Sequence, residues 1–125
     1  MKKALSIKRL INSFSHAIEG IKDVYKEEPN MLVHTIAAIL AIVFGFIFKI
    51  SYLEWFFVII MIVLVFASEV INSSIENFVD LVTSEYHIKA KKAKDEAAGF
   101  VFLMSIAALI IGLIIFIPKI IGIFR

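Results

Sequence analysis

The chain has 125 residues, of which 61% are hydrophobic and 19% are charged. Soluble domains are only about half apolar, so the composition excludes an ordinary water-soluble protein and predicts one membrane-embedded unit over residues 1–125. A net charge of +2 is too small to indicate a nucleic-acid partner, and a chain without cysteine has no disulfide or thiolate metal site.

The first expected element is an amphipathic helix at about residues 5–26. Its apolar side chains recur at helical spacing, at Ile7, Leu10, Ile11, Phe14, Ile18, Ile21 and Tyr25. Charged and polar residues lie mostly on the other side, which predicts a helix at the membrane surface. Packing against a polar surface of the protein itself is the alternative. Polar residues interrupt every apolar run of this segment, so no signal peptide is predicted.

Three apolar segments follow, each near or above the roughly 20 residues that cross a bilayer as a helix. They are expected at about residues 31–48, 53–81 and 96–117, with Pro118 closing the last. His34 is the only titratable residue in the first segment, and we interpret it as a side chain that reaches toward the interface. The predicted fold class is an all-α integral membrane protein with three transmembrane helices and an N-terminal surface helix.

The distribution of lysine and arginine predicts the orientation of these helices. Positive charges are concentrated in residues 1–28 and 89–94, whereas the connection between the first two spans holds only Lys49. The positive-inside rule therefore places the N-terminus and the second connection in the cytoplasm. The helical rise then puts Glu69 and Glu76 near the inner edge of the hydrocarbon, on the same side as Glu28.

The second span ends in a polar stripe that is unusual for lipid. Glu69, Asn72, Ser73, Glu76 and Asp80 fall on one helical face at about 100° per residue. A carboxylate in hydrocarbon costs several kcal/mol unless it is paired, hydrated or bound to a metal. Three carboxylates on one stripe therefore indicate a functional site.

The positions of these residues suggest separate roles. Glu28 and Glu76 lie near water, where two carboxylates suit a Mg²⁺ ion that also binds nucleotide phosphates. Glu69 lies deeper and suits a general base for a hydroxyl group, with Asn72 placed to orient it. Lys94 supplies a compact positive charge for phosphate. Simple hydrogen bonding between helices is the alternative for Asn72, Ser73 and Ser74, and simple solvation is the alternative for Glu76.

Two functional classes remain open from this pattern. One is an interfacial enzyme that transfers a phosphoryl group to a lipid, and the other is a small ion-conducting or structural membrane oligomer. A conduction path should continue toward the outer face, but residues 55–67 and 97–117 contain no titratable side chain. The P-loop, HRD and DFG motifs of soluble kinases are absent, which excludes an ordinary kinase.

Residues 69–80 have the spacing ExxNxxIExxxD, and residues 93–98 read AKDEAA. Together with Glu28, these segments resemble the prokaryotic diacylglycerol kinase family over almost the whole chain. His34 and the ending of the third span are more similar to the Gram-positive branch, which phosphorylates undecaprenol. His16 departs from the tyrosine that the Gram-negative branch has at this position.

The resemblance implies a homotrimer in the bacterial cell membrane, in contact with inner-leaflet lipids. It also implies a kinase that uses ATP and Mg²⁺ to phosphorylate a lipid alcohol, undecaprenol or alternatively diacylglycerol. By position, Glu69 is similar to the catalytic base, Glu28 and Glu76 to the metal ligands, and Glu69 and Ala98 to lipid-substrate contacts. The implied nucleotide contacts are Arg9, His16, Glu28, Asn72, Glu76, Glu85, Tyr86, His87, Lys94 and Asp95.

Overall fold

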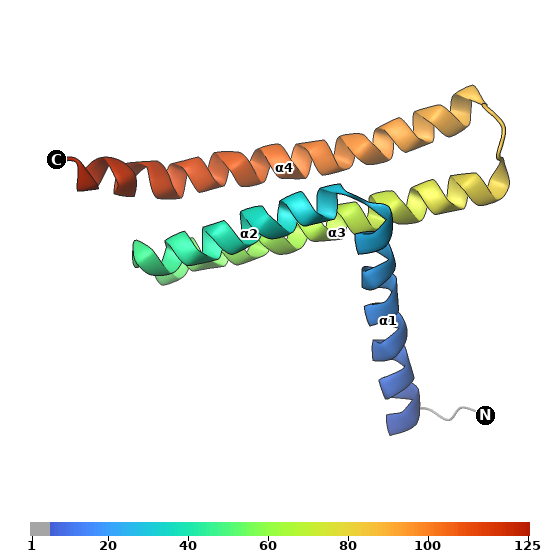
Figure 1. The fold of residues 1–125 in the computed structure, drawn as a ribbon, viewed down its shortest axis with the longest axis horizontal. Helices are drawn as coiled ribbons and strands as arrows, with labels where there is room; N and C mark the ends of the chain where they lie inside the picture. Colours follow the sequence, from blue (N-terminus) through green and yellow to red (C-terminus); the bar gives the residue numbers. More distant parts are fainter. Residues whose placement is uncertain (1–5) are drawn as a thin grey trace.

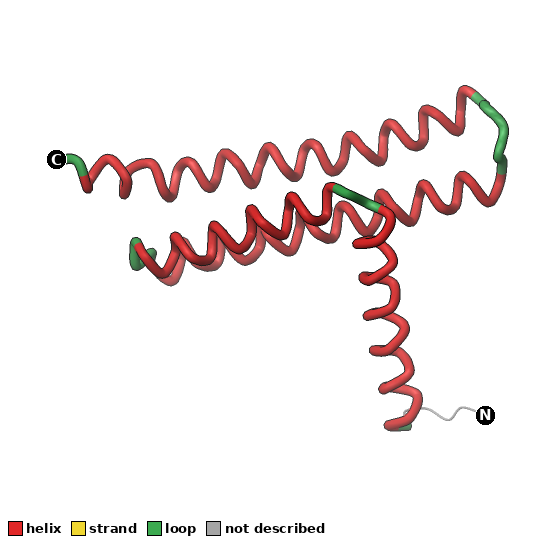
Figure 2. Tube along the Cα trace, viewed as in Figure 1, coloured by secondary structure: helices red, strands yellow, loops and turns green. Residues whose placement is uncertain are grey.

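The computed structural model describes residues 6–125, which form four α-helices joined by short connections. The helices are α1 (Ile7–Glu27), α2 (Asn30–Ile47), α3 (Tyr52–Val82) and α4 (Ile88–Ile123). Helices α2, α3 and α4 run side by side, and α1 projects steeply away from them (Figures 1 and 2). No strand occurs between residues 6 and 125. Three of the helices are long and apolar enough to cross a membrane, which confirms the predicted class at this level.

Helix α4 is longer than the expected span at residues 96–117. It begins at Ile88, because its lysine- and alanine-rich first turns are good helix formers. His87 also caps this end, since its Nδ1 accepts the backbone N–H of Lys89 at 3.1 Å. The helix continues past Pro118, although a proline removes one N–H donor and its ring crowds the preceding turn.

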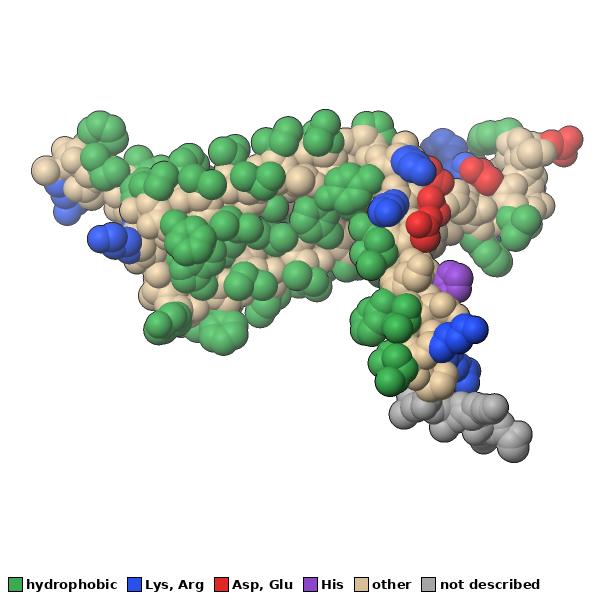
Figure 3. Space-filling view, turned by 60° about the horizontal axis from the view of Figure 1, so that its bottom comes forward, with side chains coloured by type: hydrophobic (Ala, Val, Ile, Leu, Met, Phe, Trp, Pro, Cys, Tyr) green, Lys and Arg blue, Asp and Glu red, His purple; other side chains and the backbone are tan. Residues whose placement is uncertain are grey.

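Helix α1 begins at Ile7 because the hydroxyl of Ser6 caps it, accepting the backbone N–H of Arg9 at 3.2 Å. The expected start at residue 5 lies outside the described residues. The large apolar side chains of this helix remain exposed. Figure 3 shows apolar side chains gathered on one side of α1 and basic side chains on the other.

Helix α3 is the centre of the fold, because α4, α2 and the end of α1 all pack against it. One of its faces is buried along most of its length. The buried residues on this face are Val58, Met61, Val65, Ser68, Glu69, Asn72 and Ser73. The spacing of three or four residues keeps these side chains on one side of the helix. The stripe is apolar in its first half and polar in its second, so only the second half can position reactive groups.

The far end of the bundle, where α2 ends and α3 begins, is held by apolar contacts. Val58 and Ile115 form a buried cluster with Ile50, and the ring of Phe116 packs on the aromatic side chains of α2. An ion pair between Glu54 and Lys119, with N–O distance 2.7 Å, joins the start of α3 to the end of α4. The contacts at this end stabilise the bundle and do not involve the polar half of α3.

The angle between α1 and α2 is set by a hydrogen bond next to their connection. The hydroxyl groups of Tyr25 and Thr35 are 2.6 Å apart. Thr35 already donates to the carbonyl of Met31 at 2.7 Å, so Tyr25 is the donor. This bond joins the C-terminal end of α1 to the first turns of α2.

Close packing of α2 on α3 depends on Gly45. A Cβ at this position would lie 2.6 Å from Cη2 of Trp55 and 2.8 Å from Cζ2. We predict that Gly45→Ala lowers the free energy of unfolding by about 1–3 kcal/mol, because the rigid indole must move. Thermal unfolding in detergent, followed by the fluorescence of the single tryptophan, measures this change.

Gly122→Ala is the matched control, because a Cβ there has no neighbour within 4 Å. It should leave the unfolding temperature unchanged or slightly raised, since alanine favours a helix over glycine. An unaltered unfolding temperature and unaltered tryptophan emission for Gly45→Ala would contradict the packing argument.

Candidate active site

The polar half of the α3 stripe is buried, as the periodicity predicted. Four consecutive positions on this face have little contact with solvent: Ser68, Glu69, Asn72 and Ser73. Glu69 is only 1% exposed. The stripe continues toward the α3–α4 connection with Glu76, which is half-buried, and Asp80, which is exposed. A buried carboxylate is costly without partners, so the surroundings of Glu69 determine what this site can do.

Within residues 6–125, Glu69 has one side-chain partner, and it comes from α2. The Nε2 atom of His34 lies 3.1 Å from Oε1 of Glu69. The other carboxylate oxygen, Oε2, and the Oδ1 atom of Asn72 are buried and have no hydrogen-bond partner in this part of the chain. An unsatisfied buried acceptor costs about 1–3 kcal/mol, so a donor that reaches these atoms would bind favourably. A hydroxyl group is such a donor.

The role of His34 was missed by the sequence interpretation, which placed this side chain at the interface. The His34 side chain is 17% exposed. Its ring contacts Glu69, which lies 35 residues further along the chain. No spacing rule connects two residues on different helices. The one available signal was that His34 is the only titratable residue of α2.

Glu28 and Glu76 come from different parts of the chain and interact. Glu28 follows α1 and Glu76 lies on α3, and the Glu76 carboxyl group is close enough to act on the pKa of Glu28. Their role as metal ligands stays a prediction. Burial, followed by the hydrogen bond and charge of Glu76, raises the pKa of Glu28 from 4.5 to about 7. The charges of Glu69 and Glu27 act in the same direction. This concentration of negative charge is unfavourable until a proton or a cation compensates it.

A third carboxylate, which the sequence analysis did not single out, is also held at this place. Glu27 accepts hydrogen bonds from the hydroxyl of Ser73 at 3.3 Å and from the amide of Asn77 at 3.1 Å. These contacts fix the end of α1 against α3, and they place Glu28 next to Glu76. For Ser73, the alternative of hydrogen bonding between helices is therefore correct. Figure 3 shows acidic side chains gathered where α1 meets the long helices.

Five of the predicted nucleotide contacts surround a polar recess at the α3–α4 connection. The recess has a volume of about 430 Å³ and is lined by Glu85, Tyr86, His87, Lys94 and Asp95. In this chain Lys94 pairs with Asp80 at 2.7 Å, and Lys91 pairs with Asp95 at 2.6 Å. Both pairs are largely solvent-accessible and therefore weak, so a phosphate group can compete for the lysines.

The remaining predicted residues lie elsewhere. Arg9 and His16 belong to the N-terminal half of α1, which extends away from the three long helices (Figure 1). Within one chain, this half does not join the recess. Ala98 is an exposed residue of α4, next to the buried Ala97. The roles assigned to these residues stay predictions.

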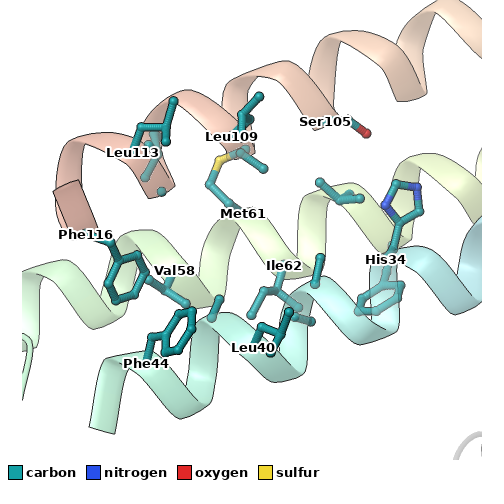
Figure 4. A pocket seen from close by; sticks show the side chains of 18 of the residues that line it. His34, Leu40, Phe44, Val58, Met61, Ile62, Ser105, Leu109, Leu113 and Phe116 are labelled. Carbon is teal, nitrogen blue, oxygen red and sulfur yellow. The ribbon is translucent and has the colours of Figure 1, made fainter. Parts of the chain in front are cut away.

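An apolar groove extends from His34 toward the far end of the bundle. It lies between α2 and α4 over the surface of α3 and has a volume of about 510 Å³. His34 and Ser105 are the polar residues of its lining, and they lie together at one end (Figure 4). Phe44 and Phe116 line the other end. Glu69 does not line the groove, but its contact with His34 places the buried carboxylate next to the polar end.

The residues present fit a Mg²⁺ ion that is bound together with phosphate groups. Among residues 6–125 no group of three or more histidine or acidic side chains can hold a metal ion without other ligands. Mg²⁺ in nucleotide sites commonly has one or two carboxylate ligands, with phosphate oxygens and water completing the shell. The pair Glu28 and Glu76 supplies this number, and its mutual repulsion favours a cation.

A sequence profile described as prokaryotic diacylglycerol kinase matches residues 15–116. The chain belongs to this family. The match confirms the resemblance that residues 69–80 and 93–98 indicated. Membership also favours the phosphotransferase over the ion-conducting oligomer that the pattern alone left open.

Relatives in the family include kinases for two lipids. The undecaprenol kinase of Bacillus subtilis (strain 168) is 40% identical over 113 residues, covering 90% of this chain and 92% of that protein. A diacylglycerol kinase of Helicobacter pylori is 38% identical over 112 residues, covering 90% of this chain and 81% of that protein. The diacylglycerol kinase of Escherichia coli (strain K12) is 28% identical over 102 residues, covering 82% of this chain and 84% of that protein.

The raised pKa of Glu28 predicts a pH-dependent stability of the metal-free protein. The Glu28 carboxyl group holds its proton more tightly in the folded chain than in the unfolded chain. Ionised Glu28 therefore destabilises the folded state. This destabilisation is fully present above about pH 7 and disappears as the pH falls toward 4.5. Glu28→Gln should therefore raise the unfolding temperature by several degrees at about pH 8 and change it little at about pH 5. Thermal unfolding with EDTA tests this difference.

Glu19→Gln, on the exposed surface of α1, is the matched control and should show no such difference. The same gain for Glu28→Gln at both pH values would mean that charge repulsion with Glu76 does not operate.

Proposed function

We propose that this protein is an ATP- and Mg²⁺-dependent kinase that phosphorylates the hydroxyl group of a membrane lipid alcohol, and that the alcohol is undecaprenol. The observation that carries the proposal is the buried carboxylate of Glu69. One of its oxygens has no partner among the described residues, and the other contacts His34, which lines the polar end of an apolar groove. A lipid tail in the groove would bring its terminal hydroxyl group to the oxygen that has no partner.

ATP would bind on the other side of the acidic cluster. The polar recess at the α3–α4 connection accepts the nucleotide, and Lys94 exchanges Asp80 for a phosphate oxygen. Glu28 and Glu76 would hold the magnesium ion, which neutralises charge on the transferred phosphate when it is bound. Binding of the ion would relieve the repulsion between the carboxylates of Glu28 and Glu76, which favours this arrangement.

The chemistry is a direct transfer. The lipid hydroxyl gives its proton to Oε2 of Glu69, and its oxygen attacks the γ-phosphorus of ATP. The new O–P bond forms while the bond to the β-phosphate oxygen breaks, and the electron pair leaves with ADP. The side chain of Asn72, one turn from Glu69, stabilises the hydroxyl or a phosphate oxygen. Positioning and charge neutralisation supply most of the rate enhancement in reactions of this type.

The groove favours undecaprenol over diacylglycerol as the substrate. Its lining is apolar apart from His34 and Ser105, so it has few groups that could recognise the ester linkages of diacylglycerol. A polyprenyl chain has no polar group other than its terminal hydroxyl. The relative from Bacillus subtilis bears the name undecaprenol kinase and matches this chain over 90% of its length, which supports the same choice.

The placement in the membrane follows from charge and from the exposed face of α1. The N-terminus and the α3–α4 connection lie in the cytoplasm of a bacterial cell, where ATP is available. Helix α1 lies on the inner leaflet as an amphipathic surface helix, with its exposed apolar side chains in contact with inner-leaflet lipids.

The functional unit is a homotrimer. Within one chain, the half of α1 that carries Arg9 and His16 extends away from the recess (Figure 1). A neighbouring copy can bring these residues to the nucleotide. Three helices are also few for enclosing both a lipid and ATP, which favours sites between subunits.

Replacement of the two central carboxylates should separate their roles. Glu69→Gln should lower kcat by at least about 100-fold, because the lipid hydroxyl loses its proton acceptor, with little change in ATP affinity. Glu76→Gln should instead weaken binding of Mg²⁺-ATP. Steady-state kinetics in mixed micelles and equilibrium nucleotide binding measure the two effects. Glu19→Gln serves as the control, and near-normal turnover of Glu69→Gln would refute the base assignment.

The substrate assignment is tested by phosphate transfer from radiolabelled ATP to undecaprenol and to diacylglycerol in parallel. We expect a higher kcat/KM for undecaprenol. Gly112→Leu should raise KM for undecaprenol roughly tenfold, because leucine would occupy open space in the groove at a cost of about 1–3 kcal/mol. KM for ATP should stay unchanged.

Gly122→Leu is the matched control, because Gly122 does not line the groove. A short prenol is the second control, since its tail leaves the Gly112 end of the groove empty. Preference for diacylglycerol would overturn the substrate assignment, and an unchanged KM for undecaprenol in Gly112→Leu would place the lipid tail elsewhere. Label on neither lipid would contradict the proposed activity.

A further inference from the structure

The contact between His34 and Glu69 has no role in the reaction as described so far. Nε2 of His34 lies 3.1 Å from Oε1 of Glu69, and the two side chains are 17% and 1% exposed. An ionised carboxylate only accepts hydrogen bonds, so the ring nitrogen is the donor in this pair. The imidazole therefore carries its proton on Nε2 and occupies one specific oxygen of the carboxylate.

We infer that His34 is a positioning residue for Glu69: its Nε2–H group holds Oε1 and thereby presents Oε2 to the lipid hydroxyl. The inference rests on the proposed function, in which Glu69 is the proton acceptor. It adds a residue from α2 to a site otherwise built from α1, α3 and α4. His34 keeps its own proton throughout the reaction, so only Oε2 of Glu69 receives the proton of the substrate.

The location of the pair supports this role. His34 and Ser105 form the polar end of the groove, so a hydroxyl that arrives there meets the carboxylate next to His34 (Figure 4). A carboxylate without a fixed partner would rotate about its last side-chain torsion and share both oxygens with any donor. The hydrogen bond removes this freedom in surroundings of low dielectric constant, where such bonds are strong.

The helices are joined by other polar contacts, so the pair is not needed simply to attach α2. Thr35, next to His34, is bonded to Tyr25 of α1 at 2.6 Å. Glu27 is bonded to Ser73 and Asn77 of α3. These bonds join α2 to α1 and α1 to α3, so α2 is attached to the bundle by contacts other than that of His34. The contact of His34 with Glu69 is therefore available for orientation of the carboxylate.

The surroundings of Glu69 make the hydrogen bond from His34 important. Glu28, after α1, places negative charge near Glu69. Helix α4 contributes Ser105 at this end of the groove, and α2 contributes His34. Among the described residues, His34 is the side chain that donates a hydrogen bond to the carboxylate of Glu69. Its loss should therefore leave the orientation of the carboxylate unfixed.

Two substitutions separate the donor from the rest of the ring. His34→Leu removes the donor at similar volume and should lower kcat roughly 10- to 100-fold, the usual cost of losing a residue that orients a reacting group. KM for ATP should stay constant, so the loss should appear in kcat alone. His34→Gln keeps an N–H donor and should retain kcat within about fivefold of wild type. Val33→Leu, on the exposed neighbouring side chain, is the control.

The double variant Glu69→Gln/His34→Leu should be no slower than Glu69→Gln alone, because His34 acts only through Glu69. A His34→Leu enzyme with normal kcat would overturn the inference. Equal losses in His34→Leu and His34→Gln would overturn it too, since the donor would then be irrelevant.

Should His34→Leu fail to fold, rescue of His34→Ala by added imidazole supports the inference, and absence of rescue in folded His34→Ala contradicts it. Normal turnover of Glu69→Gln would instead disprove the proposed function itself.

Discussion

The structure depends on the cost of burying the carboxylate of Glu69 inside a membrane bundle. An ionised group in such surroundings is unfavourable by several kcal/mol unless hydrogen bonds or opposite charge compensate it. Helix α3 carries this group on the same face that packs against its neighbours. Each neighbouring helix must therefore place polar or charged side chains against this stripe where it crosses α3. This requirement decides which residues of α1, α2 and α4 lie together, and it explains why polar groups are concentrated in one half of the fold.

The other three helices meet this requirement one after another along α3. His34 of α2 bonds to Glu69, and Glu27 at the end of α1 bonds to Ser73 and Asn77. Lys94 of α4 pairs with Asp80, one turn beyond Glu76. Each contact joins a different helix to a successive turn of α3, so the polar contacts also determine the register of the bundle. Glu28 and Glu76 are the exception, because two carboxyl groups meet there and the charge of Glu76 helps to raise the pKa of Glu28. This repulsion is the reason why the proposed cation is assigned to this pair.

The sequence predicted those features that depend on one helix at a time. Hydropathy located three membrane helices, and the helical period placed Glu69, Asn72 and Glu76 on one face. The contact of His34 with Glu69 was not predictable, because it depends on where α2 crosses α3, 35 residues away in the chain. Glu27 was given no role for the same reason, whereas Glu28 was assigned as a metal ligand from its position near water. Helix α4 extends beyond the predicted membrane span, because its charged first turns are helical by propensity without being apolar.

The two cavities of the site suggest why one family contains kinases for chemically different lipids. The groove offers polar atoms only from His34 and Ser105, both at the end next to Glu69, and apolar side chains elsewhere. In the proposed function, such a surface selects for an apolar tail and for a hydroxyl that can reach the carboxylate. It has few groups that could recognise the part of the lipid between the tail and the hydroxyl. Apolar contacts discriminate weakly, by about 1–3 kcal/mol for each methylene group that fits or fails to fit. Changes in the lining of the groove can therefore alter lipid preference, while the charged stripe of α3 and its partners keep the phosphoryl transfer unchanged.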